Sequence, residues 1–106
     1  MYRYQRETGA ATLDMLVSPG VAFSVESLRV HLSAAPATVE NLVVSAVSPG
    51  TVYNVVLLEQ AMAAVTDLHW QPARPIPFVA GSGVRVAWSN AATRTYGCEV
   101  VFTGNA

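Results

Sequence analysis

The segments VRVAW at Val84–Trp88 and YGCEVVF at Tyr96–Phe102 decide the fold class of this chain. Each alternates large apolar residues with residues that are mostly polar or small, which is the pattern of a strand with one buried face. With a turn centred on Ala92 between them, apolar residues lie opposite one another on one side, and Arg85 lies opposite Glu99 on the other. We therefore predict that the two segments pair as a β-hairpin.

This register also predicts which side chains lie in the core. The apolar pairs are Trp88 with Tyr96, Val86 with Cys98, and Val84 with Val100. Cys98 has no cationic residue beside it in the sequence, so a buried and unreactive thiol is expected rather than a nucleophile. Because it is the only cysteine, an internal disulfide is excluded and a cysteine-based zinc site is not expected.

The same alternation predicts further strands, which are separated by turns that contain proline and glycine. They are Leu13–Val17, Val21–Val25, Leu28–Leu32, Leu42–Val47, Val52–Leu58 and Ile76–Val79. Glu59–Thr66 is rich in helix formers and predicts one or two helical turns. Asp67–Pro77 is predicted to be a connecting loop because three prolines crowd its second half. The sequence thus predicts an all-β fold, a two-sheet antiparallel, jelly-roll-like sandwich of seven or eight strands with at most one short helical turn.

The composition indicates a single domain, residues 1–106, with part of its surface covered. Only 12% of the 106 residues are charged, against about 25% in typical soluble domains, and 52% are hydrophobic. Every basic residue is arginine, which is enriched at protein interfaces where lysine is depleted, although a GC-rich genome would produce the same bias. We expect the protein to bind other chains and to form a homo-oligomer, either a dimer or a trimer.

Charge and hydropathy exclude two classes of partner. With a net charge of −1, the chain lacks the excess of positive charge that nucleic-acid binding needs. The longest apolar runs are far too short to span a bilayer, so no membrane partner is expected. The start of the chain is polar and lacks the apolar region of a secretion signal.

No group of residues predicts catalysis or metal binding, so we expect no enzyme activity and no cofactor. Hydrolytic chemistry needs Ser, His and Asp side chains that converge, or two carboxylates across a cleft. His31 faces outward on its predicted strand, where a solvent or interface side chain is the favoured interpretation. Asp67 and His69 offer two metal ligands, but no third lies near them in the sequence, and packing beside Trp70 is favoured for His69.

Two segments, Tyr2–Arg6 and Asp67–Pro77, carry residue types that are common at protein interfaces. Tyrosine and arginine are among the residues most enriched at interface hot spots. The candidate contact residues are Tyr2, Arg3, Tyr4, Arg6, Asp67, His69 and Trp70. Residues 1–10 are either an extended arm that a partner orders or a frayed terminus, and the sequence leaves both open. An apolar sheet face near Val43 and Val56 is a third candidate contact surface.

Five pieces of the sequence follow one another in a recognisable order. They are Glu26–Ser33, Tyr53–Leu58, Pro75–Phe78, Val84–Asn90 and Thr95–Val100. This order resembles the small β-sandwich decoration or cement proteins of tailed phages and prophages. The resemblance implies a jelly-roll-like sandwich without catalysis that binds the major capsid protein across subunit joints, often as a dimer or trimer. It also implies that the protein is made in the bacterial host cytoplasm and ends on the capsid surface of the virion.

The leading hypothesis is therefore a non-enzymatic virion protein that decorates or cements a phage capsid, and three alternatives stay open. A carbohydrate-binding module of a head fibre or tail would use Trp70 with Asp67, Asn90 and Arg94. A tail or connector adaptor protein has no sequence feature that separates it from a decoration protein. A small enzyme that uses Asp67 and His69 is disfavoured because no further group converges on them.

Overall fold

The chain forms nine strands and no helix within residues 2–50 and 54–104, which the computed structural model describes. The strands are β1 (Tyr2–Gly9), β2 (Leu13–Val17), β3 (Phe23–Leu32), β4 (Asn41–Val47), β5 (Val56–Ala61), β6 (Asp67–Trp70), β7 (Ile76–Phe78), β8 (Gly83–Trp88) and β9 (Tyr96–Gly104). The strands predicted at Leu13–Val17, Leu42–Val47 and Ile76–Val79 are confirmed to within one residue.

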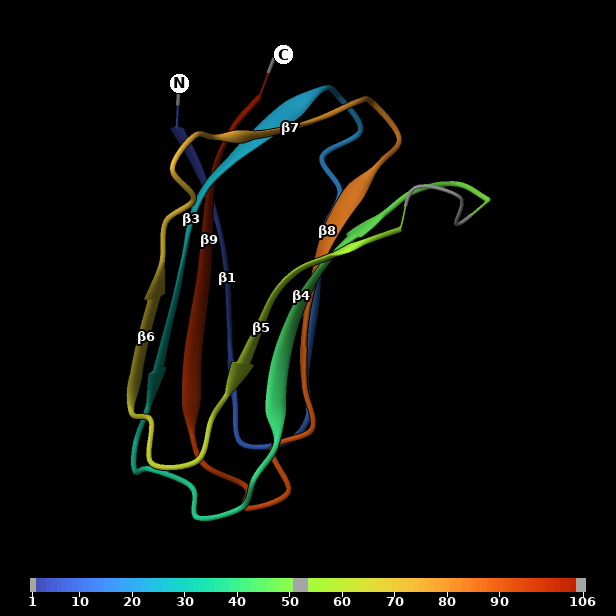
Figure 1. Cartoon of the computed structure of the whole chain (residues 1–106). Helices are drawn as coiled ribbons and strands as arrows, with labels where there is room; N and C mark the ends of the chain where they lie inside the picture. Colours follow the sequence, from blue (N-terminus) through green and yellow to red (C-terminus); the bar gives the residue numbers. More distant parts are fainter. Residues whose placement is uncertain (1, 51–53, 105–106) are drawn as a thin grey trace.

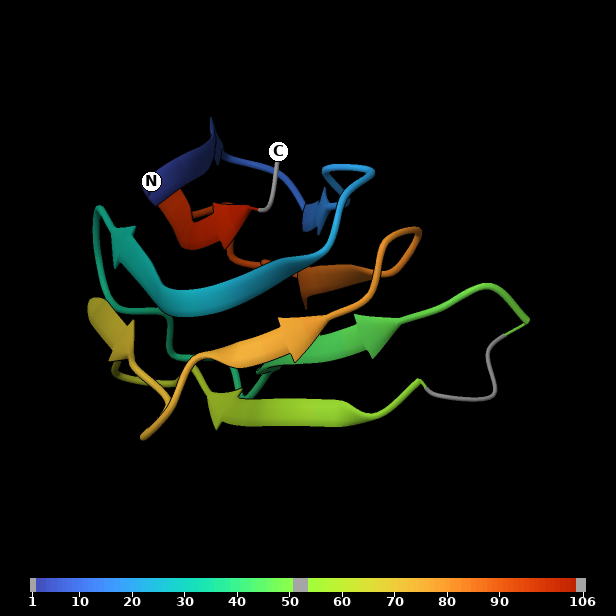
Figure 2. The same cartoon turned by 90° about the horizontal axis from the view of Figure 1, so that it is seen from above.

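The strands form two antiparallel sheets that lie in two layers (Figures 1 and 2). The five-stranded sheet has the order β1-β9-β3-β6, and β7 pairs with the first part of β3. The four-stranded sheet has the order β2-β8-β4-β5. The predicted all-β, two-sheet antiparallel sandwich is confirmed, with nine strands in the described residues where seven or eight were predicted.

The strand pairs are nested as in a jelly roll. The first strand pairs with the last, β2 pairs with β8, β3 with β6 and β4 with β5, and every pair is antiparallel. The first half of the chain therefore runs antiparallel to the second half, and this long double ribbon is rolled into two sheets. The start of β1 and the end of β9 lie at the same end of the molecule (Figure 1).

The predicted hairpin of β8 and β9 is wrong, although both strands exist. β8 lies between β2 and β4 in one sheet, and β9 lies between β1 and β3 in the other. Trp88, Tyr96 and Cys98 are buried as predicted, but they enter the core from different sheets. Alternation reports which face of a strand is buried, and a core between two sheets satisfies it as well as a hairpin does.

The predicted ion pair between Arg85 and Glu99 is replaced by two separate sets of contacts. Arg85 lies on the outer surface of the four-stranded sheet, where its Nε and Nη2 each donate to Asp14 at 2.7 Å. These hydrogen bonds are the main reason why the pKa of Asp14 is lowered and the pKa of Arg85 is raised. Glu99 lies on the outer surface of the five-stranded sheet, with Arg6 and Arg29.

Asn90 holds the segment that crosses from β8 in one sheet to β9 in the other. Its side chain is buried; Nδ2 donates to the carbonyls of Ala11 and Arg94 at 2.8 and 2.9 Å, and Oδ1 accepts from the Arg94 N–H at 2.9 Å. Its φ of 51° lies in the left-handed region, which asparagine tolerates better than most residues. The crossing therefore depends on one buried amide that bonds on both sides.

Three further predictions need correction. The strands predicted at Val21–Val25 and Leu28–Leu32 are parts of one strand, β3, which begins at Phe23 and has a register shift between Val25 and Ser27. Glu59–Thr66 contains no helix, because its first residues continue β5 beside β4, and pairing in a sheet outweighs helix propensity. Asp67–Pro77 is not a loop throughout, since β6 and the start of β7 fall within it. The predicted strand start at Val52 lies outside the described residues, and β5 begins at Val56.

The N-terminal segment is an edge strand. β1 pairs with β9 over its whole length, from Tyr2 opposite Thr103 to Gly9 opposite Tyr96. Residues 2–9 are therefore neither a free arm nor a frayed end. Their outward side chains instead extend the outer surface of the five-stranded sheet.

The core lies between the two sheets and takes its side chains from both. Its largest fully buried side chains are Trp88, Leu13, Leu28, Leu32, Leu42 and Met62. Phe23 stacks on Phe78 with ring centroids 4.9 Å apart and meets Phe102 edge-on at 5.8 Å, which packs β7 against the end of the core. The apolar faces that the sequence alternation predicts are therefore the faces that meet.

Replacing Asn90 with alanine is expected to lower the free energy of unfolding by about 3–4 kcal/mol. Each of its three hydrogen bonds contributes about 1 kcal/mol, and the left-handed backbone costs alanine about 1 kcal/mol more. Asn90→Gly should recover about 1 kcal/mol of this loss, because glycine adopts a positive φ without strain. Urea denaturation followed by tryptophan fluorescence measures both variants.

Asn41→Ala is the matched control for this prediction. Asn41 is exposed and its side chain makes one hydrogen bond, to Glu59 at 2.9 Å, so its loss should cost under about 1 kcal/mol. Equal destabilisation by the Asn41 and Asn90 variants would show that the buried amide does not hold the crossing.

Candidate functional site

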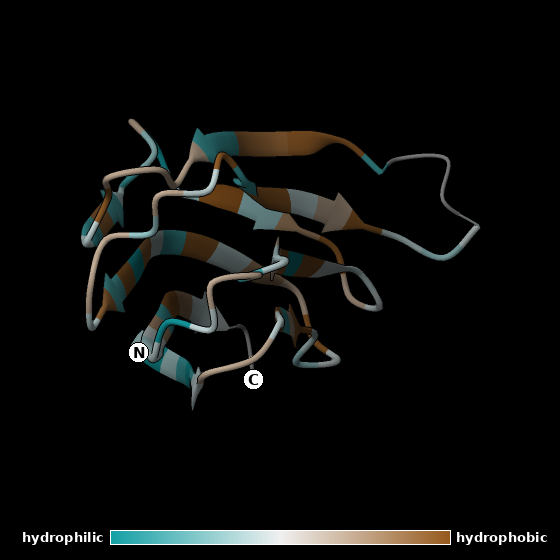
Figure 3. Ribbon diagram, turned by 90° about the horizontal axis from the view of Figure 1, so that it is seen from below, coloured by the Kyte–Doolittle hydropathy of each residue, from teal (hydrophilic) through white to brown (hydrophobic). Residues whose placement is uncertain are grey.

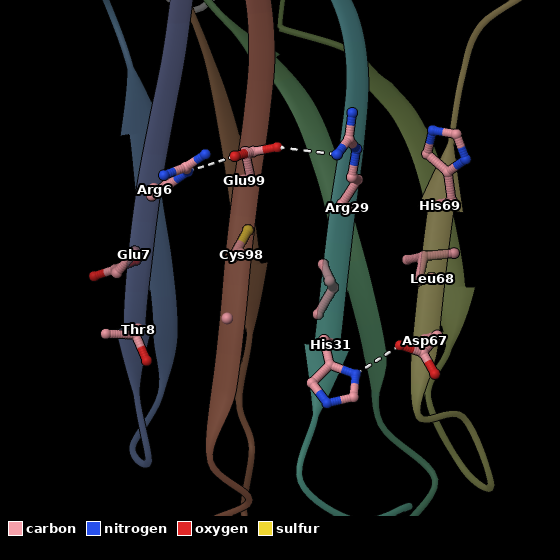
Figure 4. Close-up of a pocket in the computed structure, with 12 residues that line it drawn as sticks. Arg6, Glu7, Thr8, Arg29, His31, Asp67, Leu68, His69, Cys98 and Glu99 are labelled. Atoms are coloured by element: carbon pink, nitrogen blue, oxygen red, sulfur yellow. Dashed lines mark hydrogen bonds and ion pairs between the residues drawn. The ribbon is translucent and has the colours of Figure 1, made fainter.

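The outer face of the five-stranded sheet gathers charged, imidazole and phenol side chains from four strands. Across β1, β9, β3 and β6, its two central rows are Arg6–Glu99–Arg29–His69 and Thr8–Gly97–His31–Asp67. We call these eight residues, together with Tyr2 and Tyr4, the charged face. Figure 4 shows the first row, with Arg6, Glu99, Arg29 and His69 side by side.

Glu99 links three strands in the first row (Figure 4). Arg6 donates from Nε to Glu99 Oε2, and Arg29 Nη1 lies 3.6 Å from Glu99 Oε1. Both arginines are largely exposed, whereas the side chain of Glu99 is 14% exposed. Arg6 also lies over the ring of Tyr4, 5.8 Å from its centroid. One carboxylate thus holds two guanidinium groups across the face.

His31 and Asp67 form a hydrogen-bonded pair in the second row. His31 Nδ1 and Asp67 Oδ1 are 2.6 Å apart, and this hydrogen bond is the main reason why the pKa of Asp67 is lowered. Both side chains are exposed, so solvent screens the pair and its contribution to stability is small. Asp67 therefore binds the histidine of the neighbouring strand, not His69 on its own strand.

A hollow of about 570 Å³ lies on the charged face. Gly97 forms part of its floor, and a Cβ atom added there would meet no atom within 4 Å. The φ of Gly97 is not in the left-handed region, so the backbone conformation does not require glycine here. The missing side chain therefore leaves a gap in the second row, between Thr8 and His31.

Five of the seven predicted contact residues meet on this face. Tyr2, Tyr4 and Arg6 point outward on β1, and Asp67 and His69 point outward on β6. The two strands lie at opposite edges of the four-strand row, with β9 and β3 between them. Segments about sixty residues apart thus border one surface.

The other two predicted contact residues lie elsewhere. Arg3 is opposite Phe102, whose side chain is buried, so Arg3 lies on the other side of β1. Trp70 is opposite Leu28 and is half-buried against the core, so it does not lie on the outer surface with the other predicted contact residues. Neither side chain belongs to the charged face.

The sequence analysis missed the middle of the face. Arg29, Glu99 and Gly97 were not singled out as contact residues, and His31 was interpreted as a solvent or interface side chain without being named among the contact residues. The available signal was the outward phase of each residue in its own strand. That signal does not show which strands share a sheet, so it could not bring these residues together.

The structure also bears on the metal and glycan alternatives. Among the described residues, no cluster of three or more His, Cys, Asp or Glu side chains is arranged to hold a metal ion. Asn90, a candidate for glycan binding, is buried, and its amide hydrogen-bonds to groups inside the protein.

In the part of the chain that is described, no helix has the length and apolar character needed to cross a membrane.

The outer face of the four-stranded sheet is more apolar, and we call it the apolar face. Leu16 and Val56 are 50% and 60% exposed on it, at opposite edges of a row in which Arg85 and Ser45 lie between them. Val43 and Ala87 are half-buried in the next row, between Asp14 and Glu59. Figure 3 shows that β5 is apolar over most of its length; of its apolar residues, Leu57 and Leu58 pack against the core, and Val56 is exposed on the outer face. The sheet face that was predicted near Val43 and Val56 is this surface.

Comparison with known proteins does not assign the chain to a family. No protein-family model matches the chain, and no curated protein matches it. The fold and the two outer faces are therefore the basis for any assignment of function.

Cys98 is expected to be unreactive in the folded protein. It is 2% exposed, and burial, assisted by the nearby carboxylates of Glu7 and Glu99, raises its pKa to about 12. Only about one thiol in ten thousand is then ionised at pH 8. Iodoacetamide should label it at the rate of global unfolding and completely in denaturing urea, as measured by mass spectrometry.

A thiol placed on the charged face is the control. His69→Cys in a Cys98→Ala background should react at the rate of a free thiol, because His69 is exposed. Rapid labelling of the native protein at Cys98 would contradict the buried position.

Proposed function

We propose that this protein is a non-enzymatic structural component of a tailed-phage particle, which decorates or cements the capsid. In this proposal the charged face binds the major capsid protein, and the protein moves from the host cytoplasm to the capsid surface. The observation that carries the proposal is the meeting of Tyr2, Tyr4, Arg6, Asp67 and His69, with Arg29, on one open sheet face.

The side chains of the charged face suit a protein partner. Tyrosine and arginine dominate interface hot spots, and the face carries two of each. Its carboxylates are paired before binding, Glu99 with two arginines and Asp67 with His31. Paired charges lose less solvation energy on burial than isolated ones, so a partner can cover this face at lower cost.

The size of the face supports a weak contact that is repeated many times. The molecule measures 39 × 29 × 24 Å, so its broad side is large enough for a standard interface of about 800 Å² per partner. On a lattice of identical capsid subunits, modest contacts of this kind gain strength through multivalency. A deep pocket is not needed for such a role.

The apolar face supports a second part of the proposal, a dimer or trimer of this chain. Exposed Leu16 and Val56 lie on the side of the sandwich away from the charged face. A copy of the chain that covers them leaves the charged face free for the capsid. This division explains how one small domain with few charges carries two contact surfaces.

The glycan alternative has less support. Its predicted residues do not form one surface, since Asn90 is buried in a sheet crossing and Trp70 is half-buried against the core. The polar groups at the centre of the charged face are already paired with one another. A tail or connector adaptor would use the same surfaces, so the experiment below includes tails.

Sedimentation with purified capsids tests the proposed function. The protein should sediment with mature capsids that lack it, and Arg29→Ala should weaken binding about tenfold or more, as expected for an interface hot spot. Arg74→Ala is the matched control, because Arg74 is exposed in the segment between β6 and β7 and forms no ion pair with another residue that the structure describes. It should bind like the unchanged protein.

Two outcomes would overturn this assignment. Absence of binding to capsids rejects the decoration role, and binding to purified tails instead assigns the protein as a tail adaptor. Equal loss of binding in Arg29→Ala and Arg74→Ala would reject the charged face as the docking surface.

The oligomer is tested by sedimentation velocity. The unchanged 106-residue chain should have the mass of a dimer or trimer at micromolar concentration, and Leu16→Ser with Val56→Ser should shift it to monomer because both apolar contacts are lost. Val39→Ser is the control, since Val39 is 79% exposed but lies outside the apolar face. A monomer in all three samples would reject self-association.

A further inference from the structure

The hollow on the charged face is a gap in an otherwise continuous row of side chains. Thr8, His31 and Asp67 fill their positions in the second row, and Gly97 leaves its own position empty. A Cβ atom at Gly97 would point into open space. The resulting hollow of about 570 Å³ is an open depression on the sheet face, with more than enough room for one side chain of a bound protein.

The wall of this hollow is mainly apolar, although charged residues surround it. Its lining residues are Arg6, Glu7, Thr8, Arg29, Val30, His31, Asp67, Leu68, His69, Gly97, Cys98 and Glu99. The aliphatic stems of arginine side chains and the backbone over glycine supply apolar surface even where the side chain ends in a charge. An occupant of this hollow therefore meets apolar walls below a polar rim.

Most polar groups of the rim are already paired. Glu99 holds Arg6 and Arg29, His31 holds Asp67, and the Thr8 hydroxyl donates to the carbonyl of Tyr96 at 2.8 Å. A sugar, whose hydroxyl groups each need a partner, would have to break these bonds. An occupant with few polar atoms keeps them.

The rim also presents flat groups. The guanidinium groups of Arg6 and Arg29 are held by Glu99, and the ring of His31 is held by Asp67. Planar guanidinium groups stack on aromatic rings, and Arg6 already lies over the ring of Tyr4. Held in place before binding, these groups favour an aromatic occupant over an aliphatic one.

We infer that the hollow over Gly97 is a socket for one aromatic side chain, tyrosine or tryptophan, of the protein that the charged face binds. This inference rests on the proposed docking role of the face. It adds the residue type that the partner must present and the position at which that residue enters.

Titration with small probes, followed by amide NMR of the labelled full chain, tests the socket directly. The probes are N-acetyl-tyrosinamide, N-acetyl-tryptophanamide, N-acetyl-leucinamide and maltose. The two aromatic amides should shift the signals of Gly97, Thr8 and His31 with millimolar affinity, and the leucine amide should bind at least several-fold more weakly. Maltose should shift none of them.

Gly97→Leu places a side chain on the floor of the socket, where the aromatic ring would lie, and should remove the shifts caused by the aromatic amides. The open space and ordinary φ at Gly97 mean that leucine fits without strain, and Gly97→Ala is a smaller change that should weaken binding in part. Thr103→Leu, on the same strand and face but about 20 Å away, should bind the probes like the unchanged chain. Circular dichroism confirms that each variant is folded.

The same variants separate the socket from the docking role. Capsid binding that Gly97→Leu weakens about tenfold or more, but Thr103→Leu does not, supports both. Capsid binding without any shift by the aromatic amides overturns the socket and leaves the docking role intact. Equal shifts by the leucine amide or by maltose also overturn it, maltose in favour of a glycan site. Aromatic binding in a protein that does not sediment with capsids supports the socket and rejects the capsid as the partner.

Discussion

The pairing of the last strand with the first is the constraint on which the rest of the structure depends. β9 lies between β1 and β3 in the five-stranded sheet, so it cannot take its place until both ends of the chain are present. Its inward side chains Tyr96, Cys98 and Val100 complete the core, and its outward residues Gly97 and Glu99 form the middle of the charged face. Pairing β1 with β9 closes a loop that spans nearly the whole chain, which costs conformational entropy. Only the assembled core offsets this cost, so the fold is highly cooperative.

The candidate site depends on the same strand pairing. The strands that carry it, β1, β9, β3 and β6, are not neighbours in the sequence, yet the jelly-roll order puts them side by side. Glu99 contacts Arg6 and Arg29 only because the register of two strand pairs aligns all three residues. The same alignment leaves Gly97 opposite both Thr8 and His31, so that one missing side chain becomes a hollow. The chemistry of the face is thus a consequence of topology.

The two sheets give the small domain two different surfaces. The outer face of one carries paired polar groups and tyrosines, and the outer face of the other exposes Leu16 and Val56 on either side of Arg85, which binds Asp14. A sandwich separates these surfaces by its own thickness, so each can bind a partner without hindering the other. This separation accounts for a chain that is poor in charge and yet has a strongly polar side.

The sequence by itself determined the positions of most strands and which face of each is buried, because alternation with a period of two is a local property. It correctly placed Trp88, Tyr96 and Cys98 in the core. Tertiary structure alone decided which strands pair, since the same alternation suits a hairpin and two facing sheets equally well. The crossing held by Asn90, whose amide bonds to a carbonyl 79 positions away, and the rows of the charged face are both long-range contacts, and no local pattern encodes them.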